Sequence, residues 1–201
     1  EGGNLAERVH DHGVIEIRTV LSLTVKMLDV INACSRLNII HGDIKPSNII
    51  FCDESFNYPK LGDFGLVNTA MGQLNPLTCR RKQKTMGTPA YMPPEKLEGR
   101  KLSIKSDIYS LGMTLYKMLT GHLFFNDDIL DYSGILRAVR NPSRERPSRY
   151  RSEIPDWLDR LVLKMIAAEI HKRPGNVRTH LQAMYRHAAE KNIQPLWTES
   201  L

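Results

Sequence analysis

The sequence predicts a mainly α-helical domain that also contains one short β-hairpin. Apolar residues recur near helical spacing over residues 14–37, and residues 106–121 are apolar on nearly all sides, as in a buried helix. Two short apolar segments at 49–51 and 59–62 flank a turn-rich stretch, which is typical of a hairpin. The chain has 201 residues, 41% of them hydrophobic, and is therefore long enough for one domain with a real core.

Residues that favour helix ends set the expected boundaries. We expect Ser106 to cap the N-terminus of the buried helix, because its hydroxyl can accept a backbone N–H, and Gly121 to end that helix. In the second half of the chain, apolar spacing predicts three further helices, at 129–140, 156–168 and 176–190.

A long irregular segment separates the predicted hairpin from the buried helix. Residues 64–94 contain several Gly and Pro residues and the basic cluster RRKQK, so we predict a loop. Loops of this length in small domains are usually functional or disordered.

Composition narrows the classes of function. The chain has 28 basic and 22 acidic residues and a net charge of +6, which suits a phosphate-bearing partner but is more often a solvated surface. Its three cysteines form no C-x-x-C pair, which argues against a disulfide framework and for a reducing, cytoplasmic location. Because no apolar run could span a bilayer, we expect no membrane segment in this chain, and we expect no signal peptide.

The stretch HGDIKPSN, residues 41–48, concentrates polar groups between two apolar segments. Phosphoryl transfer needs a group that takes or orients the proton of the nucleophile, a positive charge near the moving phosphate, and ligands for magnesium. Asp43 can act as the base and Lys45 as the charge, while Asn48 offers a hard amide oxygen for magnesium. The segment GDFG places Asp63 at the end of the second predicted strand as another magnesium ligand.

Five motifs in a fixed order point to a known family. HGDIKPSN, DFG, GTPAYMPPE, SDIYSLG and HKRPG follow one another along the chain. The sequence therefore resembles the large, C-terminal lobe of a eukaryotic-type protein kinase, and it is most similar to bacterial serine/threonine kinases. The resemblance implies a mainly α lobe of an α+β fold, with residues 1–190 as the large lobe and 191–201 as a C-terminal tail.

The resemblance also implies the roles of individual residues. Asp43 matches the catalytic base, Lys45 the lysine on the transferred phosphate, and Thr88 the threonine that bonds both of them. Asn48 and Asp63 match the magnesium ligands. The implied cofactors are ATP and Mg²⁺. The implied substrate is a protein hydroxyl of Ser or Thr, because Lys45 together with Thr88 favours that specificity.

Other matched residues are expected to support the site rather than react. Glu95 and Arg173 match an ion pair that ties the long loop to the late helices. Asp107 matches an aspartate that holds the catalytic loop through backbone N–H groups. His41 matches a histidine whose role is mainly structural.

Departures from the family pattern concern regulation. Gly42 stands where the family has an arginine that receives the activating phosphate, Ser47 where many members have Glu, and Pro93 where the family has Ala. Thr85, ten residues before Glu95, lies where that phosphate usually sits. We expect that Thr85 can be autophosphorylated. Activity should depend little on this phosphate, because Gly42 has no side chain to bind it.

The sequence contains no G-x-G loop and no strand lysine of the kind found in the small lobe of a kinase. Lys26 lies in a predicted helix and does not replace that lysine. We expect the chain to start just past the hinge, where Asn4 matches a residue that often contacts the ribose of ATP. We therefore expect a missing N-terminal lobe as partner, and no activity of the 201-residue chain alone.

Two alternatives stay open at this point. The first is a pseudokinase or scaffold that binds partners without phosphotransfer; a G-x-G-x-x-G loop and a strand lysine upstream of Glu1 would argue against it. The intact set Asp43, Lys45, Asn48 and Asp63 also argues against it, because a scaffold need not keep these residues. The second is a nucleic-acid binder, suggested by charge alone; the sequence has no recognisable module of that kind, so we expect no nucleic-acid partner.

Overall fold

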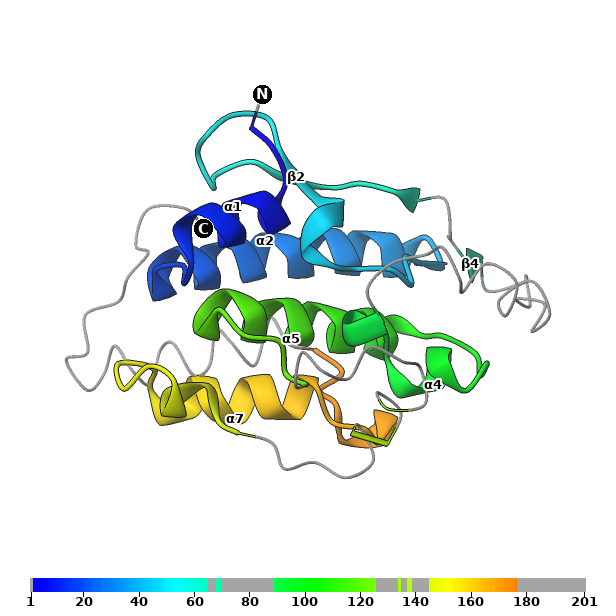
Figure 1. Cartoon of the computed structure of the whole chain (residues 1–201). Coiled ribbons are helices and arrows are strands. Elements are labelled where there is room, and N and C mark those ends of the chain that lie inside the picture. The colour runs from blue at the N-terminus through cyan, green and yellow to red at the C-terminus, as the bar shows by residue number, and fades with distance from the viewer. Residues whose placement is uncertain are drawn as a thin grey trace.

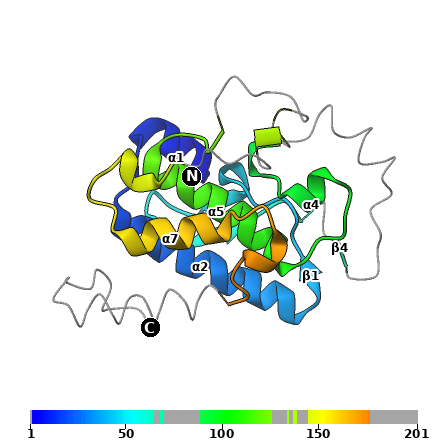
Figure 2. The same ribbon diagram turned by 90° about the horizontal axis from the view of Figure 1, so that it is seen from below.

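Three stacked helices form the frame of the domain. The structure is a computed structural model, and it describes residues 2–64, 68–69, 89–125, 134, 137–138 and 145–176. Helix α5 (Ile104–Thr120) lies between α2 (Ile17–Arg36) and α7 (Asp156–Met165), as Figure 1 shows. Figure 2 shows the same stack from below, with α7 nearest the viewer. The expected helix over 14–37 and most of the one over 156–168 are therefore confirmed.

Helix α5 is buried along nearly its whole length because helices pack on both of its sides. At Gly112 an added Cβ would lie 2.8 Å from Cγ2 of Ile166 and 2.8 Å from Cβ of Met165. The missing side chain thus lets the end of α7 approach α5 closely. The core around these helices includes Leu23, Met27, Ile49, Leu111, Leu115, Met118, Leu158 and Leu161.

The two ends of α5 test the capping predictions. Gly121 follows the helix with a φ of 75°, in the left-handed region, and confirms the predicted stop. The prediction that Ser106 caps the N-terminus is wrong, because the helix begins at Ile104 and Ser103 is the N-cap residue. Ser106 is the third helical residue, and its hydroxyl accepts the Ser103 N–H at 3.0 Å.

Helix α1 (Leu5–His12) was not predicted. Oδ1 of Asn4 accepts the N–H groups of Ala6 at 2.9 Å and Glu7 at 3.1 Å, and the Glu7 carboxylate accepts the Asn4 N–H. This is a capping box, which satisfies backbone donors that a helix start leaves unpaired. The sequence N-x-x-E at residues 4–7 carried that signal.

Two antiparallel strand pairs complete the fold. β2 (Ile49–Phe51) pairs with β3 (Pro59–Leu61), with Ile49 opposite Leu61, and confirms the predicted hairpin. β1 (Ile39–Ile40) pairs with β4 (Asn68–Thr69), which lies inside the segment predicted to be a loop. The short helical segments are η1 (Pro46–Asn48), η3 (Pro89–Tyr91), α4 (Pro94–Leu97), η4 (Pro147–Arg149) and η5 (Ile170–Lys172).

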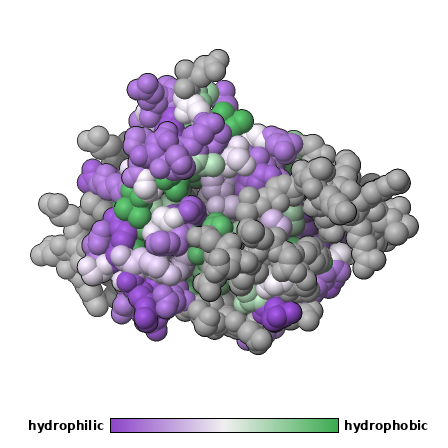
Figure 3. Space-filling model, in the orientation of Figure 1, coloured by the Kyte–Doolittle hydropathy of each residue, from purple (hydrophilic) through white to green (hydrophobic). Residues whose placement is uncertain are grey.

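Most of the predicted helices at 129–140 and 176–190, and the predicted tail 191–201, fall outside the described residues. On the face in Figure 3, hydrophilic residues predominate in the described part of the surface, and hydrophobic ones form small separate areas. Within the described ranges, no helix combines the length and the apolar character needed to cross a membrane.

Candidate active site

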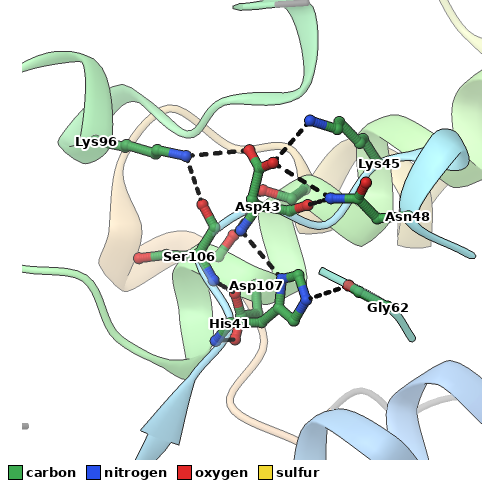
Figure 4. A network of polar contacts seen from close by, with 10 residues as sticks. His41, Asp43, Lys45, Asn48, Gly62, Lys96, Ser106 and Asp107 are labelled. Carbon is green, nitrogen blue, oxygen red and sulfur yellow. Dashed lines mark hydrogen bonds and ion pairs between the residues drawn. The ribbon is translucent and has the colours of Figure 1, made fainter. Parts of the chain in front are cut away.

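The candidate site is the loop of residues 41–48, which joins β1 to β2 beside the N-terminal end of α5 (Figure 4). Ile44 and Pro46 are buried and anchor the loop in the core. The intervening polar residues face one another, so the sequence alternates between anchoring and polar side chains.

Asp107 holds the start of this loop from the first turn of α5. Its Oδ2 accepts the His41 N–H at 3.0 Å, and its Oδ1 accepts the Gly42 N–H at 2.8 Å, which confirms the predicted brace. Burial raises the pKa of Asp107, and the N–H groups of Gly42 and His41 act in the opposite direction without cancelling that effect. Gly42 has a φ of 73°, a left-handed conformation that glycine adopts without strain.

The His41 imidazole connects two loops. Its Nδ1 accepts the Asp43 N–H at 3.2 Å, and its Nε2 lies 2.9 Å from the Gly62 carbonyl oxygen. A carbonyl oxygen only accepts, so Nε2 carries the hydrogen and the ring is neutral in this arrangement. The ring also packs edge-on against Phe64, with centroids 4.8 Å apart. These contacts agree with the structural role expected for His41.

The Asp43 carboxylate lies at the centre of the site and is 8% exposed. Its Oδ2 accepts bonds from Nζ of Lys45 at 2.7 Å and from Nδ2 of Asn48 at 3.2 Å. Its Oδ1 accepts a bond from Nζ of Lys96 at 3.2 Å. Two cations therefore flank one buried carboxylate.

The charges around Asp43 decide its protonation state. Burial raises the pKa of this carboxyl, but the charge of Lys96 and the bond from Lys45 lower it more, so the net pKa lies below the ordinary value of 3.8. Asp43 is therefore ionised at neutral pH and can accept a hydrogen bond from a hydroxyl group.

Asn48 and Asp63 come together through the backbone. The Gly62 N–H donates to the Asn48 carbonyl at 2.8 Å, and Asp63 is the next residue. Nδ2 of Asn48 donates to the Asp43 carbonyl at 2.8 Å, which turns the amide oxygen away from Asp43, as Figure 4 shows. Asp63 is exposed and has a φ of 57°, a conformation that is uncommon outside glycine and often found at functional sites.

A comparison with protein families now decides the assignment. The family model described as "Protein kinase domain" matches residues 1–187. The chain belongs to the protein kinase family. This kinase chain has the mainly helical fold and small hairpin expected for the large lobe.

Similar proteins are bacterial serine/threonine kinases, as the motifs predicted. The chain is 34% identical over 164 residues to serine/threonine-protein kinase A of Synechocystis. This match covers 79% of the chain and 30% of the relative. It is 32% identical over 178 residues to PknB of Mycolicibacterium smegmatis, with shares of 88% and 27%. With the DNA damage-responsive kinase RqkA of Deinococcus radiodurans it shares 33% over 165 residues, or 80% and 22% of the two chains. In each case, less than a third of the relative is matched.

The Glu95–Arg173 pair of this kinase chain has the expected form. Nη1 of Arg173 lies 2.6 Å from Oε1 of Glu95, and Nη2 lies 2.8 Å from Oε2. Ser106 also donates to Oε1 at 2.7 Å. The pair fastens α4 to the N-terminal part of α5 and to the segment that follows η5.

Lys96 is the kinase residue at the site that sequence reasoning missed. It directly follows Glu95 in α4 and reaches Asp43 across 53 positions of the chain. The sequence offered one weak signal. Lys96 stands between Glu95, the last residue of the motif GTPAYMPPE, and the apolar Leu97, and both neighbours are buried. Lysine in such a place is normally paired.

The contacts predicted for Thr88 and Asn4 stay predictions. Thr88 lies outside the described residues, so its predicted bonds to Asp43 and Lys45 stay a prediction. Asn4 forms an isolated bridge with Ile50 of β2, and its side chain caps α1. Its predicted contact with the ribose of ATP also stays a prediction.

Proposed function

We propose that the protein containing this chain is an ATP-dependent serine/threonine protein kinase, and that this chain supplies its phosphotransfer centre. The observation that carries the proposal is the arrangement around Asp43. A buried, ionised carboxylate is bonded by Lys45 and Asn48, and the backbone of Asn48 is joined to the residue before Asp63. A base, a cation and two oxygen ligands are the groups that phosphoryl transfer requires.

In the proposed reaction, the hydroxyl of a protein Ser or Thr donates a hydrogen bond to Asp43. As the hydroxyl oxygen bonds to the γ-phosphorus and the bond to ADP breaks, its proton passes to the Asp43 carboxylate. The Lys45 ammonium is placed to contact the transferred phosphate as a point charge. Its present bond to Asp43 keeps that ammonium within reach of the reacting oxygen.

The donors at Asn48 and Asp63 fit Mg²⁺, which prefers amide and carboxylate oxygens. The amide oxygen of Asn48 faces away from Asp43 and is thus free of the bonds that fix the amide nitrogen. When bound, Mg²⁺ would neutralise charge on the ATP phosphates. Asn48 and Asp63 would hold the ion beside Asp43.

A nucleotide surface is also supported near the hairpin. Ile50 is 44% exposed although it is an apolar residue of a strand, and it lies across a bridge from Asn4. An exposed apolar side chain beside polar groups suits the flat face of a base and the hydroxyls of a sugar. We infer that Asn4 and Ile50 form one side of the ATP site and that an N-terminal lobe supplies the other.

The proposed partners are a protein substrate and that N-terminal lobe. We also infer a cytoplasmic location, since Cys34 and Cys52 are free in the described structure, as expected in a reducing compartment. Cys34 is partly buried and Cys52 exposed.

The test uses the full-length protein, with radiolabelled ATP and a generic protein substrate. Asp43→Asn should lower the rate by about 10²–10⁴-fold, the usual contribution of a general base. Asp63→Asn should cripple the rate and raise the Mg²⁺ concentration needed for half-maximal activity. Asp156→Asn is the matched control, because the Asp156 side chain is exposed at the start of α7.

Parental rates in both Asp43→Asn and Asp63→Asn would refute the assignment of these residues. The 201-residue chain alone should show no turnover, because it lacks the glycine-rich loop and strand lysine of a complete nucleotide site. Robust phosphate transfer by that chain would overturn the inferred need for an N-terminal lobe.

A further inference from the structure

The buried lysine of α4 has no role in the reaction described so far. The Lys96 side chain is 9% exposed, and its Nζ donates to the Gly42 carbonyl at 2.6 Å and to Oδ1 of Asp43 at 3.2 Å. Lysine is almost never buried unless it is paired, because removing an ammonium group from water is costly. The pairing of Lys96 with the catalytic loop therefore needs an explanation.

The contacts of Asp43 divide between its two oxygens. Lys45 and Asn48 both bond Oδ2, and both belong to the same short loop as Asp43 itself. Oδ1 is bonded from a different element, by Lys96. Bonds to one oxygen leave the carboxylate free to turn about its last torsion, which has broad minima. Among the described residues, Lys96 is the group that bonds the second oxygen and so limits that rotation.

Helix α4, which carries Lys96, is itself held in place. The neighbouring residue Glu95 is bonded by both terminal nitrogens of Arg173 and by the Ser106 hydroxyl. Adjacent residues of α4 thus face two ways. Glu95 points toward the ion pair with Arg173, and Lys96 points toward the catalytic loop, as Figure 4 shows. An ammonium held in this way is positioned before any substrate arrives.

Gly42 contributes its backbone to this arrangement. It carries no side chain, and its carbonyl accepts the shorter of the two Lys96 bonds while its N–H donates to Asp107. Residue 42 thus supplies no positive charge, and the cation that reaches the loop from outside it is Lys96 of α4. The contact of Lys96 with the loop requires no phosphorylation.

We propose that Lys96 is a positioning residue of the phosphotransfer centre, which holds Asp43 in one orientation by bonding the oxygen that Lys45 and Asn48 leave free. The inference rests on the proposed kinase function. It extends that function by a residue that none of the five family motifs assigns to catalysis.

The test compares Lys96→Met, Lys96→Arg and the control Lys101→Met in the full-length protein. Lys101 is exposed, so its replacement removes the same charge away from the site. Lys96→Met should lower kcat about 10–10²-fold, since a small misplacement of a catalytic group has effects of this order. The KM for ATP should change less than about threefold, because Lys96 touches the base and no predicted nucleotide ligand.

The pH profile separates positioning from a general effect on folding. In Lys96→Met the acid limb of kcat/KM should move to higher pH, because a cation that favours ionised Asp43 is lost. In Lys96→Arg a cation remains, so that limb should stay near its original place even if the rate falls. An unchanged kcat and an unchanged acid limb in a folded Lys96→Met variant would overturn the inference.

A measurement that needs no turnover completes the design. Carboxyl ¹³C NMR of the same full-length variants, with Asp43→Asn to identify the signal, reports the titration of Asp43 directly. The midpoint should rise in Lys96→Met and not in Lys101→Met; equal midpoints would show that Lys96 does not act on Asp43. If the midpoint rises but no variant, including the parent, transfers phosphate, the contact stands and the proposed function fails. If the parent is active and Lys96→Met equals it in rate, the positioning role alone fails.

Discussion

Arg173 and Glu95 form a two-point ion pair across 78 positions of the chain, with N–O distances of 2.6 and 2.8 Å. Both side chains are excluded from water, with exposures of 0% and 1%. Arg173 also donates to the backbone carbonyls of Lys105, Ala167 and Ala168. One guanidinium group therefore fastens α4, the first turn of α5 and the segment that follows α7 to one another.

Removing Arg173 should destabilise the domain strongly. Arg173→Met would leave the Glu95 carboxylate buried without its cation, and such a loss costs about 3–5 kcal/mol in the free energy of unfolding. Urea denaturation of the chain measures this change. The control Arg160→Met removes an exposed arginine, 3.9 Å from Asp156, and should cost less than about 1 kcal/mol. A double variant with Glu95→Gln should recover part of the loss, since no charge is then left unpaired.

Acid should weaken the fold through the same pair. Burial raises the pKa of Glu95, but the bonds from Arg173 and Ser106 lower it more, so it lies below the ordinary value of 4.5. Because the folded-state pKa is lower than the unfolded one, Glu95 contributes stability above pH 4.5 that is lost as the pH falls further. Asp43, with an ordinary value of 3.8 and a lowered pKa, acts in the same direction.

Unfolding free energies measured from about pH 6 down to about pH 3 test this expectation. The parent should lose stability below pH 4.5, and Glu95→Gln should show a shallower decline over the same range. Parallel curves for the two proteins would show that Glu95 does not contribute.

A methyl group at Gly112 should separate two core helices. Gly112→Ala places a carbon 2.8 Å from side-chain atoms of Met165 and Ile166, so α5 and α7 must move apart. Such overpacking costs about 1–3 kcal/mol, against a gain of about 1 kcal/mol from the better helix propensity of Ala. Gly175→Ala is the matched control, because no atom lies within 4 Å of its added Cβ. Thermal melts should show a lower midpoint for Gly112→Ala only.

Phosphorylation of the long loop should have little effect on activity. Gly42 offers no side chain to bind a phosphate on Thr85, while Lys96 provides a permanent cation at Asp43. We therefore expect Thr85→Ala, and the parent after phosphatase treatment, to keep activity within about tenfold, or about 1.4 kcal/mol in barrier. A larger loss in initial-rate assays would mean that another basic residue binds the phosphate.

The sequence predicted the elements whose patterns are long and regular. Helix α2 and helix α5 have many apolar residues at helical spacing, and the hairpin has turn residues between two apolar segments. The β1–β4 pair could not be found in this way, because strands of two residues carry no periodicity. Ser106 was read as a cap because serine favours that position, but Ser103, three residues earlier, fits the same preference.

In the candidate site too, the contacts between residues close in sequence were predictable, and one contact between distant elements was not. Asp43, Lys45 and Asn48 lie within six positions, so their proximity followed from the sequence itself. The contact of Asp107 with the loop followed from the family resemblance, and the structure confirms it. Lys96 was not predicted, since its approach to Asp43 depends on how Glu95 orients α4, a tertiary relationship that no local pattern records.

The bonds of His41 have a consequence for the spacing between the base and the metal ligands. One imidazole ring lies between the Asp43 N–H and the Gly62 carbonyl, so the width of that ring, together with the Gly62–Asn48 backbone bond, sets how far apart the two loops stand. Displacements of the hairpin and of the catalytic loop are therefore correlated, and Asp43 and Asp63 can shift together while their separation is preserved. The coupling requires a ring with one donor and one acceptor.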